Sequence, residues 1–473
     1  MAQSHATSCA APVLFLLAVV GAACSDGDHA VKTKNGSAGA SSGAVNASGG
    51  VANASGGTAN ISGGVANASA GTASTSVVAV SGGSVNTSSA SAVNGGDRGI
   101  GGRSSAATAG GAALLNPAPG TKAFVGVNFW RIDWEGTADF FLSNVQWQTV
   151  QNPWQPQLLT DLAPFTVLRF MDWNLTNDDP NPQSNWASRK LPTQSQTSEP
   201  IAFEWQLDLC NRALKDCWIT VPIQANASFQ ASLAQLTYER LDARLRLYVE
   251  YSNEVWNGGF PQADLALAQA DQLNLPTPGN SCCTTETIKL SNSYVYGAVR
   301  LFEQFESVFG KNSPRLVKVL SGQAGWDGPC QVHMQALKNT TLNPKGTMPS
   351  VYAIAPYFGG TSLSTLTNGI PTASDGVKAH VSCAAKQGLT VIGYEGGSDS
   401  YAAGNGCATL QHDAGMYEIY KKYLDALVAA GMKGPIMQYT AVGSCWGLKE
   451  KTGDSLEKSP KYRAVAEWIA AQP

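Results

Sequence analysis

Charged residues are scarce in this chain of 473 residues. Asp, Glu, Lys and Arg together make up 14% of it, and the formal net charge at pH 7 is -3. A protein that binds nucleic acid concentrates positive charge on one face, and this chain has few Lys and Arg residues for such a face. We therefore expect no nucleic-acid partner.

Metal-binding and nucleotide-binding patterns are also missing. The candidate site residues include no histidine cluster and no cysteine pair at the spacing of metal ligands. No glycine-rich phosphate loop follows the first predicted strand, at residues 123–130, which counts against a nucleotide-binding doubly wound sheet. The sequence therefore predicts no catalytic metal and no cofactor.

The N-terminal apolar run, residues 12–20, is shorter than the ~20 residues that cross a membrane as a helix. The small residues that follow it lead to Cys24, so residues 1–24 fit a secretion signal. This segment resembles a bacterial lipoprotein signal, which implies an acylated Cys24 and membrane attachment. The alternative is an ordinary cleaved signal. Both predict an exported protein, either secreted or held at the cell surface.

Residues 25–120 have a biased composition of Gly, Ser, Ala, Asn and Thr, and an Asn-X-Ser triplet recurs every seven residues at Asn46, Asn53, Asn60 and Asn67. Such a segment buries too little apolar surface to offset the entropy lost on ordering. We predict a disordered, low-complexity tether that precedes a catalytic domain at residues 121–473.

From residue 122 onward, apolar runs typical of strands alternate with helical patterns. The predicted strands cover residues 123–130, 166–173, 217–224, 245–252, 316–322, 351–357, 389–395 and 434–440. The predicted helices cover residues 203–215, 228–236, 291–309, 414–430 and 462–471, and long loops cover 131–157 and 174–200. Eight strands separated mostly by helices indicate an α/β fold of the (β/α)8 TIM-barrel type, with a doubly wound sheet as the competitor.

Two of these strands share an unusual ending. Residues 245–252 alternate between apolar and polar side chains, and they run directly into Asn253 and Glu254. Residues 389–395 end in Glu395, and two glycines follow closely in both places. Two glutamates at strand ends are what a two-carboxylate glycoside hydrolase needs, if the fold brings them together.

The other strand ends are polar and aromatic. In a barrel, active residues project from the C-terminal ends of the strands. Besides the two glutamates, these ends supply Asn128, Trp130, Arg169, Asp172, Gln224, Asn226, Asn253, Gln323, Trp326, Tyr357 and, just past the last strand, Trp446, while Trp256 lies two residues beyond Glu254. Trp130, Trp256 and Trp326 are each open to two interpretations, a core residue or a flat surface on which a sugar stacks.

This set of residues resembles clan A of the glycoside hydrolases, the cellulase-type retaining enzymes of the family 5 kind. The resemblance implies that Glu254, in its Asn-Glu pair, is the acid/base and that Glu395 is the nucleophile. It also implies that Arg169 and Tyr357 hydrogen-bond the nucleophile.

The same resemblance gives Asn253 a contact with the sugar 2-hydroxyl and makes Trp446 the floor of the subsite for the cleaved sugar. The expected activity is retaining hydrolysis of a β-glycan by an exported enzyme, best matched by internal cleavage of β-1,4-glucan. An exo-acting glycosidase and a non-hydrolytic carbohydrate-binding protein remain as alternatives. The expected partner is a polysaccharide or oligosaccharide, and we expect a monomer.

Cysteines and one further acid complete the predictions. An even number of cysteines after the signal region of an exported chain suggests disulfides. We expect Cys210 to pair with Cys217 and Cys407 with Cys445, whereas the adjacent Cys282 and Cys283 are expected to reach different partners. Glu250 lies mid-strand, so we expect it to be a buried partner of Arg169 or Arg246.

Overall fold

The computed structural model describes residues 112–130, 154–196, 198–279 and 281–472. The predicted secretion signal, the predicted tether up to residue 111 and most of the predicted loop at 131–157 lie outside these residues.

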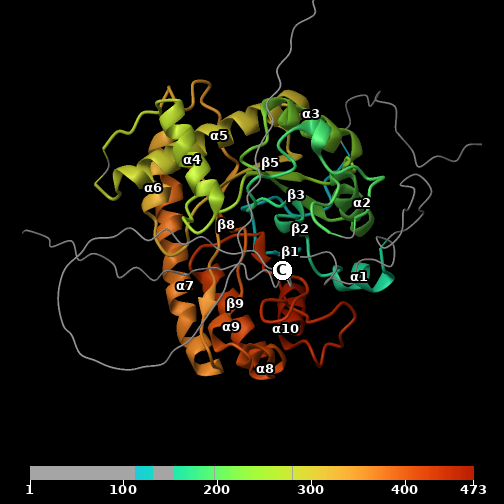
Figure 1. Ribbon diagram of the computed structural model, residues 1–473. Coiled ribbons are helices and arrows are strands. Elements are labelled where there is room, and N and C mark those ends of the chain that lie inside the picture. Colours follow the sequence, from blue (N-terminus) through green and yellow to red (C-terminus); the bar gives the residue numbers. More distant parts are fainter. Residues whose placement is uncertain (1–111, 131–153, 197, 280, 473) are drawn as a thin grey trace, which may run out of the picture. The chain divides into compact units, whose positions relative to one another are not determined.

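Eight parallel strands close into a barrel at the centre of the molecule (Figure 1). The barrel strands are β1 (Val125–Asn128), β2 (Val167–Arg169), β3 (Asp216–Val221), β4 (Leu247–Tyr251), β5 (Leu316–Ser321), β6 (Val351–Ile354), β8 (Val391–Gly393) and β10 (Ile436–Gln438). Each lies inside one of the eight predicted strands or within a residue of it, and they follow one another around the barrel in chain order. The predicted TIM barrel is confirmed. A small parallel ribbon of β7 (Phe358–Gly359) and β9 (Ser398–Asp399) extends from it.

Helices surround the barrel (Figure 1). The five predicted helices are α2 (Phe203–Ala213), α3 (Ala227–Arg240), α5 (Thr285–Phe309), α9 (Gly415–Ala429) and α10 (Pro460–Ala470). The sequence did not predict α1 (Pro156–Asp161), α4 (Pro261–Gln272), α6 (Gly328–Ala336), α7 (Leu363–Ala384) or α8 (Gly406–His412). Short 3-10 turns occupy η1 (Asp172–Asn174), η2 (Trp186–Ser188), η3 (Ala385–Gln387) and η4 (Tyr401–Ala403). Helix α7 escaped prediction because Pro371 lies inside it and small or polar residues make up much of its length.

The alternation along each strand decides which side chains enter the barrel. In β4, Leu247, Val249 and Tyr251 belong to the large core between the strands and the helices. Tyr248 belongs to a second cluster inside the barrel, with Trp218 of β3 stacked on it at a ring-centroid distance of 5.3 Å. The polar set of the alternation, including Glu250, therefore faces the barrel axis, because neighbouring side chains point to opposite faces of a strand.

The residues just before β1 are bound to the barrel wall. The backbone N–H of Leu115 donates to the carbonyl of Arg244 at 3.0 Å, and that of Gly120 donates to Gly434 at 2.9 Å. Asn116 donates to Asp216 at 3.0 Å and accepts from Arg246 at 2.7 Å through its carbonyl. The last residues of the predicted 25–120 tether are thus part of the folded body.

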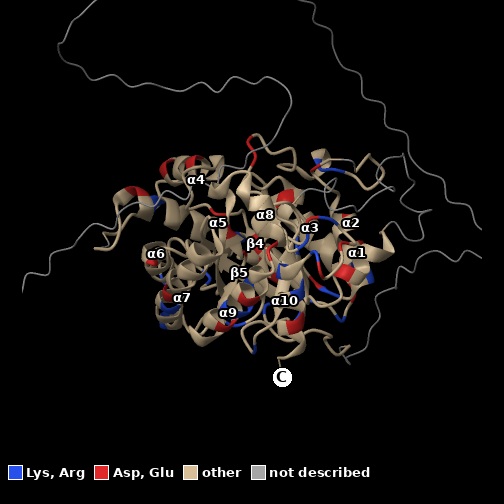
Figure 2. Cartoon of the chain, turned by 90° about the horizontal axis from the view of Figure 1, so that it is seen from below, with Lys and Arg blue, Asp and Glu red and all other residues tan. Residues whose placement is uncertain are grey.

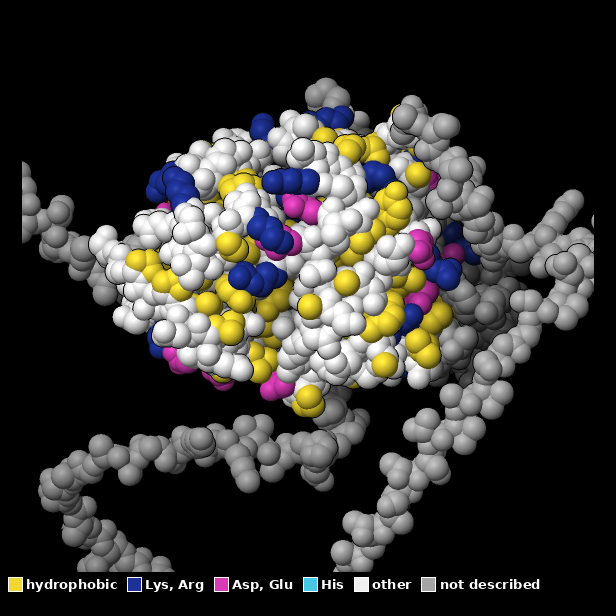
Figure 3. Space-filling model, turned by 90° about the horizontal axis from the view of Figure 1, so that it is seen from above, with side chains coloured by type: hydrophobic (Ala, Val, Ile, Leu, Met, Phe, Trp, Pro, Cys, Tyr) yellow, Lys and Arg dark blue, Asp and Glu magenta, His cyan; other side chains and the backbone are white. Residues whose placement is uncertain are grey.

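The surface carries charges of both signs. Figure 2 shows acidic and basic residues distributed over the outer helices. On the face seen in Figure 3, basic and acidic side chains are interspersed and the hydrophobic ones lie in scattered patches. Among the described residues, no helix combines the length and apolar character needed to cross a membrane.

The disulfides match the prediction only in part. Cys407 pairs with Cys445, as predicted. The predicted pairing of Cys210 with Cys217 is wrong, because both are buried free thiols between α2 and β3 that pack as small core side chains.

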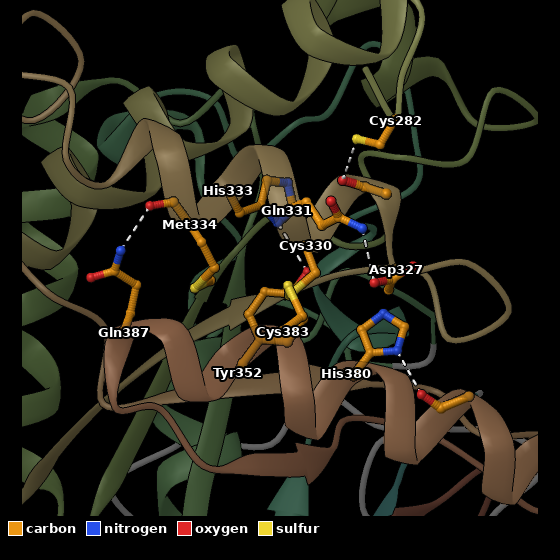
Figure 4. Close-up of a disulfide and its surroundings, with 12 residues drawn as sticks. Cys282, Asp327, Cys330, Gln331, His333, Met334, Tyr352, His380, Cys383 and Gln387 are labelled. Carbon is orange, nitrogen blue, oxygen red and sulfur yellow. Dashed lines mark hydrogen bonds between the residues drawn. A yellow bond between two sulfur atoms is a disulfide. The ribbon is translucent and has the colours of Figure 1, made fainter. Parts of the chain in front are cut away.

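The expectation for Cys282 and Cys283 is also wrong, since the two adjacent cysteines pair with each other. A pairing that the sequence did not suggest joins Cys330 of α6 to Cys383 of α7 (Figure 4). Tyr352 lies beside this bond, and its hydroxyl is 3.0 Å from Nδ1 of His333. These cysteines are 53 residues apart, and only the packing of α6 on α7 reveals that they meet.

Candidate active site

Arg169, at the end of β2, is the hub of a fully buried polar network inside the barrel mouth. Its guanidinium donates to Glu395 at 2.7 Å and to Glu250 at 2.9 and 3.0 Å. It also donates to the side-chain oxygens of Asn128 and Asn253, each at 2.9 Å. One cation thereby holds residues from the ends of β1, β2, β4 and β8 in a fixed arrangement.

Glu250 serves the site as a structural acid. Its carboxylate accepts from Arg169 and, at 2.9 Å, from the indole of Trp218. Burial alone would lower the pKa of Arg169, yet the charges of Glu250 and Glu395 raise that pKa above its ordinary value. The expected barrel partnership between Glu250 and Arg169 is confirmed.

Glu395 follows β8 by two residues and is 5% exposed. Each of its carboxylate oxygens has one donor: Arg169 reaches Oε1 at 2.7 Å and the Tyr357 hydroxyl reaches Oε2 at 2.9 Å. Burial raises the pKa of Glu395, while the charge and hydrogen bond of Arg169, together with the Tyr357 hydrogen bond, oppose that rise. These two donors favour the ionised carboxylate and fix its orientation.

Glu254 has a different environment at the end of β4. Its carboxylate accepts from the Tyr394 hydroxyl at 2.9 Å and from the Asn257 amide at 3.0 Å, both of them neutral donors. Burial, followed by the negative charge of Glu395, raises the pKa of Glu254 to about 7. Glu254 is therefore mostly protonated below about pH 7, whereas the cation next to Glu395 favours the ionised form of that carboxylate.

The backbone at Glu254 is strained. Its φ is 41° and that of Ser252 is 60°, both in the left-handed region that residues other than glycine seldom adopt. Strain of this kind costs on the order of 1–3 kcal/mol and concentrates at functional sites. With this backbone, the Glu254 side chain reaches the Tyr394 hydroxyl just beyond the end of β4.

The two asparagines are held tightly. Asn128, which is fully buried, donates to the carbonyl of Tyr394 at 3.1 Å. Asn253 donates to the side-chain oxygen of Asn177 at 3.1 Å. Gln262 donates to the Asn253 carbonyl and to the Asn177 side-chain oxygen, at 2.7 Å each. Asn128 and Asn253, both predicted as site residues, thus lie in the network around Arg169.

Trp446 lies past β10 and contacts the network through aromatic rings. Its centroid is 5.6 Å from that of Tyr357, with an interplanar angle of 77°, and 6.1 Å from that of Tyr439 at 70°. Tyr357 donates to Glu395, so the Tyr357 ring lies between Trp446 and that carboxylate in the chain of contacts. The structure therefore brings Glu254, Glu395, Asn128, Asn253, Arg169, Tyr357 and Trp446 together.

The other three predicted tryptophans differ from one another. Trp130, half-buried, lies near the Trp446 loop, since a Cβ placed on Gly443 would be 3.7 Å from its Cε3. Trp256 is half-buried, and its buried indole nitrogen has no hydrogen-bond partner among the described residues. Trp326 is 37% exposed and covers Gly328 at the start of α6. Among the described residues, no ring stacking or hydrogen bond joins Trp326 to the residues of the Arg169 network, and its ring packs instead against Gly328.

Sequence reasoning missed several members of the site. Tyr394 and Asn257 hold Glu254, Trp218 holds Glu250, and Tyr439 donates to Asp172 at 3.4 Å. Burial and then the charge of Glu395 raise the pKa of Asp172 well above its usual range. Proximity to a glutamate in sequence is a usable signal for Tyr394 and Asn257. The alternation of β8 is a second signal for Tyr394, because Ile392 and Tyr394 both belong to the cluster inside the barrel.

In the residues that the structure describes, no group of three or more His, Cys, Asp or Glu side chains is placed to hold a metal ion.

Comparisons with known proteins give structural matches only. No protein-family model matches the chain, and no curated protein does. Among solved structures, it is similar to a GH51 arabinofuranosidase from Xanthomonas axonopodis pv. citri, with 12% identity, a TM-score of 0.48, and 74% of each chain covered. It is similar to a 4-O-α-L-rhamnosyl-β-D-glucuronidase from Fusarium oxysporum, with 13% identity, a TM-score of 0.46, and 76% of this chain and 73% of that one covered.

A further match is a GH5-4 broad specificity endoglucanase from an uncultured bacterium, with 13% identity, a TM-score of 0.44, and 75% of this chain and 95% of that one covered. At such low values the similarity does not extend to a substrate or a reaction.

Proposed function

We propose that this protein is a retaining β-glycoside hydrolase that works by double displacement. The observation that carries the proposal is the contrast between two buried glutamates in one site. Glu395 is bound by a cation and a tyrosine hydroxyl, whereas Glu254 has neutral donors only and a pKa raised to about 7 by burial and by the charge of Glu395. Paired acids whose environments separate their pKa values in this way take opposite roles in acid–base chemistry.

In the first step, a carboxylate oxygen of Glu395 attacks the anomeric carbon and forms an ester bond to it. The bond between that carbon and the glycosidic oxygen breaks, and the departing oxygen takes the proton of Glu254. Arg169 and Tyr357 keep the attacking carboxylate ionised and oriented.

In the second step, Glu254, now ionised, removes a proton from a water molecule that attacks the same carbon. The ester bond breaks and Glu395 leaves as a carboxylate, so both acids return to their starting states. Formation of the ester also removes the negative charge of Glu395, and this lowers the proton affinity of Glu254 when it must act as the base.

The proposed substrate is a β-linked polysaccharide cleaved internally, with β-1,4-glucan or a related β-glycan as the first choice. Trp446 and Tyr357 supply aromatic surface beside Glu395, on which a sugar ring can stack. The alternatives are an exo-acting glycosidase and a carbohydrate-binding protein without hydrolysis. The strained backbone of Glu254 and its raised pKa favour an enzyme over a binding protein.

Export is part of the proposal and rests on the apolar run at residues 12–20 and on Cys24. The mature N-terminus, read by mass spectrometry after expression in a bacterial host, tests it. A diacylated Cys24 supports lipid attachment, an unmodified cleaved chain supports secretion, and an uncleaved chain contradicts both.

The reaction is tested by incubating the protein with glucan, mannan, xylan and mixed-linkage glucan and measuring reducing ends. We expect the wild type to cleave one substrate class. Glu303→Gln is the matched control and should cleave the same class, because Glu303 lies on α5, where its carboxylate pairs with Lys345. Glu395→Ala should abolish the activity.

Retention is tested with azide, which should give a β-glycosyl azide with Glu254→Ala and an α-glycosyl azide with Glu395→Gly. A wild type that binds a glycan but hydrolyses none would support the binding protein instead.

A further inference from the structure

Tyr401 is a large aromatic side chain that the proposed reaction does not use. It begins the η4 turn and is 49% exposed. Its ring lies 6.5 Å from that of Trp446, centroid to centroid, and the two planes differ by only 19°. Two nearly parallel ring faces therefore stand next to each other, and the inner one contacts Tyr357.

A short ribbon connects Tyr401 to Tyr357 and Glu395 at its base. Strand β7 begins directly after Tyr357, and β9 begins three residues after Glu395. The two strands pair through Phe358 with Ser398 and Gly359 with Asp399. At the outer end of the ribbon, the Asp399 carboxylate accepts from the backbone N–H of Tyr401 at 3.2 Å. The ribbon thus leads from Glu395 outward to Tyr401.

Trp446, the other member of the ring pair, lies in a loop whose neighbouring residues Cys445 and Gly447 are both bound to the fold. Cys445 is bound to Cys407 of α8, and its carbonyl accepts from the buried Lys461 ammonium at 2.9 Å. The carbonyl of Gly447 accepts from Gln411 of α8 at 2.7 Å. Since α8 follows η4 closely in the chain, the disulfide fastens the Trp446 loop to the segment that carries Tyr401.

We propose that Tyr401 extends the aromatic surface of Trp446 outward and binds a second sugar of the substrate chain, adjacent to the sugar that lies on Trp446 at Glu395. The ligand class is a neutral β-linked oligosaccharide, because the surface offers ring faces and the ionised Glu395 carboxylate in the adjacent sugar site disfavours an anionic sugar. Binding to a rigid, exposed pair costs little ordering entropy. This inference rests on the proposed function, since it deepens the same site.

The inference predicts a change in KM without a change in kcat. With cellohexaose, mannohexaose and xylohexaose as probes, Tyr401→Ala should raise KM for the cleaved hexasaccharide about three- to tenfold and leave kcat within about twofold. Tyr401→Phe should match the wild type, because the ring face and not the hydroxyl makes the contact. Tyr238→Ala is the matched control, since Tyr238 is 44% exposed on α3 and packs on Phe309.

Binding without turnover provides the second measurement. In a Glu395→Gln background, Tyr401→Ala should weaken the Kd of the same hexasaccharide by the same factor. An unchanged KM and Kd, an equal loss in Tyr401→Phe, or a fall in kcat as large as the rise in KM would each overturn the inference. If the protein hydrolyses the hexasaccharide and the Tyr401 variants do not change KM or Kd, the proposed aromatic surface is wrong and the proposed reaction is unaffected. If binding depends on Tyr401 but no hydrolysis occurs, the proposed reaction is wrong and the aromatic surface is unaffected.

Discussion

At the scale of single residues, Arg169 organises the site. It is fully buried, and its guanidinium reaches two glutamates and two asparagines that lie in, or just after, the three strands β1, β4 and β8. A planar cation with five donors fits such a set, whereas a lysine ammonium offers three donors from a single point. The same cation binds Glu395 directly and favours its ionised form, whereas Glu254 has only neutral donors and a pKa raised to about 7.

The first prediction concerns pH. The pKa of Glu254 is raised to about 7, so the proton needed for the departing oxygen is present below that pH and lost above it. We expect kcat/KM to fall as pH rises through about 7. The Asn257 hydrogen bond favours the ionised form of Glu254. Asn257→Ala should therefore raise that pKa and move the alkaline limb of the pH profile to higher pH. A limb that stays in place or moves downward contradicts the assignment of Glu254 as the acid.

The second prediction concerns Arg169. Arg169→Met leaves Glu250 and Glu395 buried without their cation. Removing one partner of a buried ion pair costs about 3–5 kcal/mol of unfolding free energy. We expect that loss in denaturant unfolding, with Arg169→Lys recovering only part of it. Lys345→Met is the control, because its ammonium is 70% exposed, and it should change the midpoint little. A midpoint unchanged in Arg169→Met would show that the network does not stabilise the barrel.

At the scale of elements, the two glycine pairs that follow the glutamates turn out to serve different purposes. Gly397 has a φ of +120°, and Gly396 faces the Tyr423 hydroxyl so closely that an added Cβ would be 2.5 Å from it. Gly258 has open space around the position of an added Cβ. The backbone conformation therefore requires glycine at position 397 and close packing requires it at 396, whereas neither requires it at 258.

The third prediction uses this difference. Gly397→Ala forces an L residue into a strained conformation next to Glu395 and should lower stability by more than about 1 kcal/mol, together with kcat. Gly258→Ala, the matched variant after Glu254, should leave both nearly unchanged. Thermal unfolding and initial rates measure the two effects. Equal losses in both variants would contradict the distinction.

The fourth prediction compares two disulfides. The pairs Cys407–Cys445 and Cys330–Cys383 close 38 and 53 residues, respectively. Loop-closure entropy makes each worth about 4 kcal/mol, nearly the same value. Replacing either pair with serines should therefore cost similar stability. Only the Cys407–Cys445 variant should raise KM, because that bond holds the loop of Trp446. A similar rise in KM from the Cys330–Cys383 variant, which lies between α6 and α7, would sink this prediction.

At the scale of the whole molecule, the barrel is closed at its N-terminal side by the segment before β1. Asn116 bonds to both Asp216 and Arg246, and Leu115 bonds to Arg244. The active residues lie at the opposite ends of the strands, so this segment acts on stability and not on the reaction.

The fifth prediction follows from that separation. A chain that begins at residue 112 should keep the kcat and the melting temperature of the full chain. A chain that begins at residue 121 loses the hydrogen bonds to Asp216 and Arg246 and should melt several degrees lower, with kcat per folded molecule unchanged. Calorimetry and active-site titration distinguish the cases. An equal melting temperature for both truncations would contradict a role for residues 115–120.

The sequence by itself determined the barrel and its main polar residues. The strand alternation and the polar residues at strand ends are local, one-dimensional patterns, and a parallel barrel maps strand ends onto one face. The sequence therefore predicts that Glu254, Glu395, Arg169, Tyr357 and Trp446 lie together at one end of the barrel.

The tertiary structure alone decided what depends on contacts between distant segments. The hydrogen bond from Tyr394 to Glu254, the bond between Cys330 and Cys383, and the stacking of Tyr401 on Trp446 join residues that no local pattern relates. The raised pKa of Glu254 belongs to this group as well, because burial and a neighbouring charge exist only once the barrel has closed.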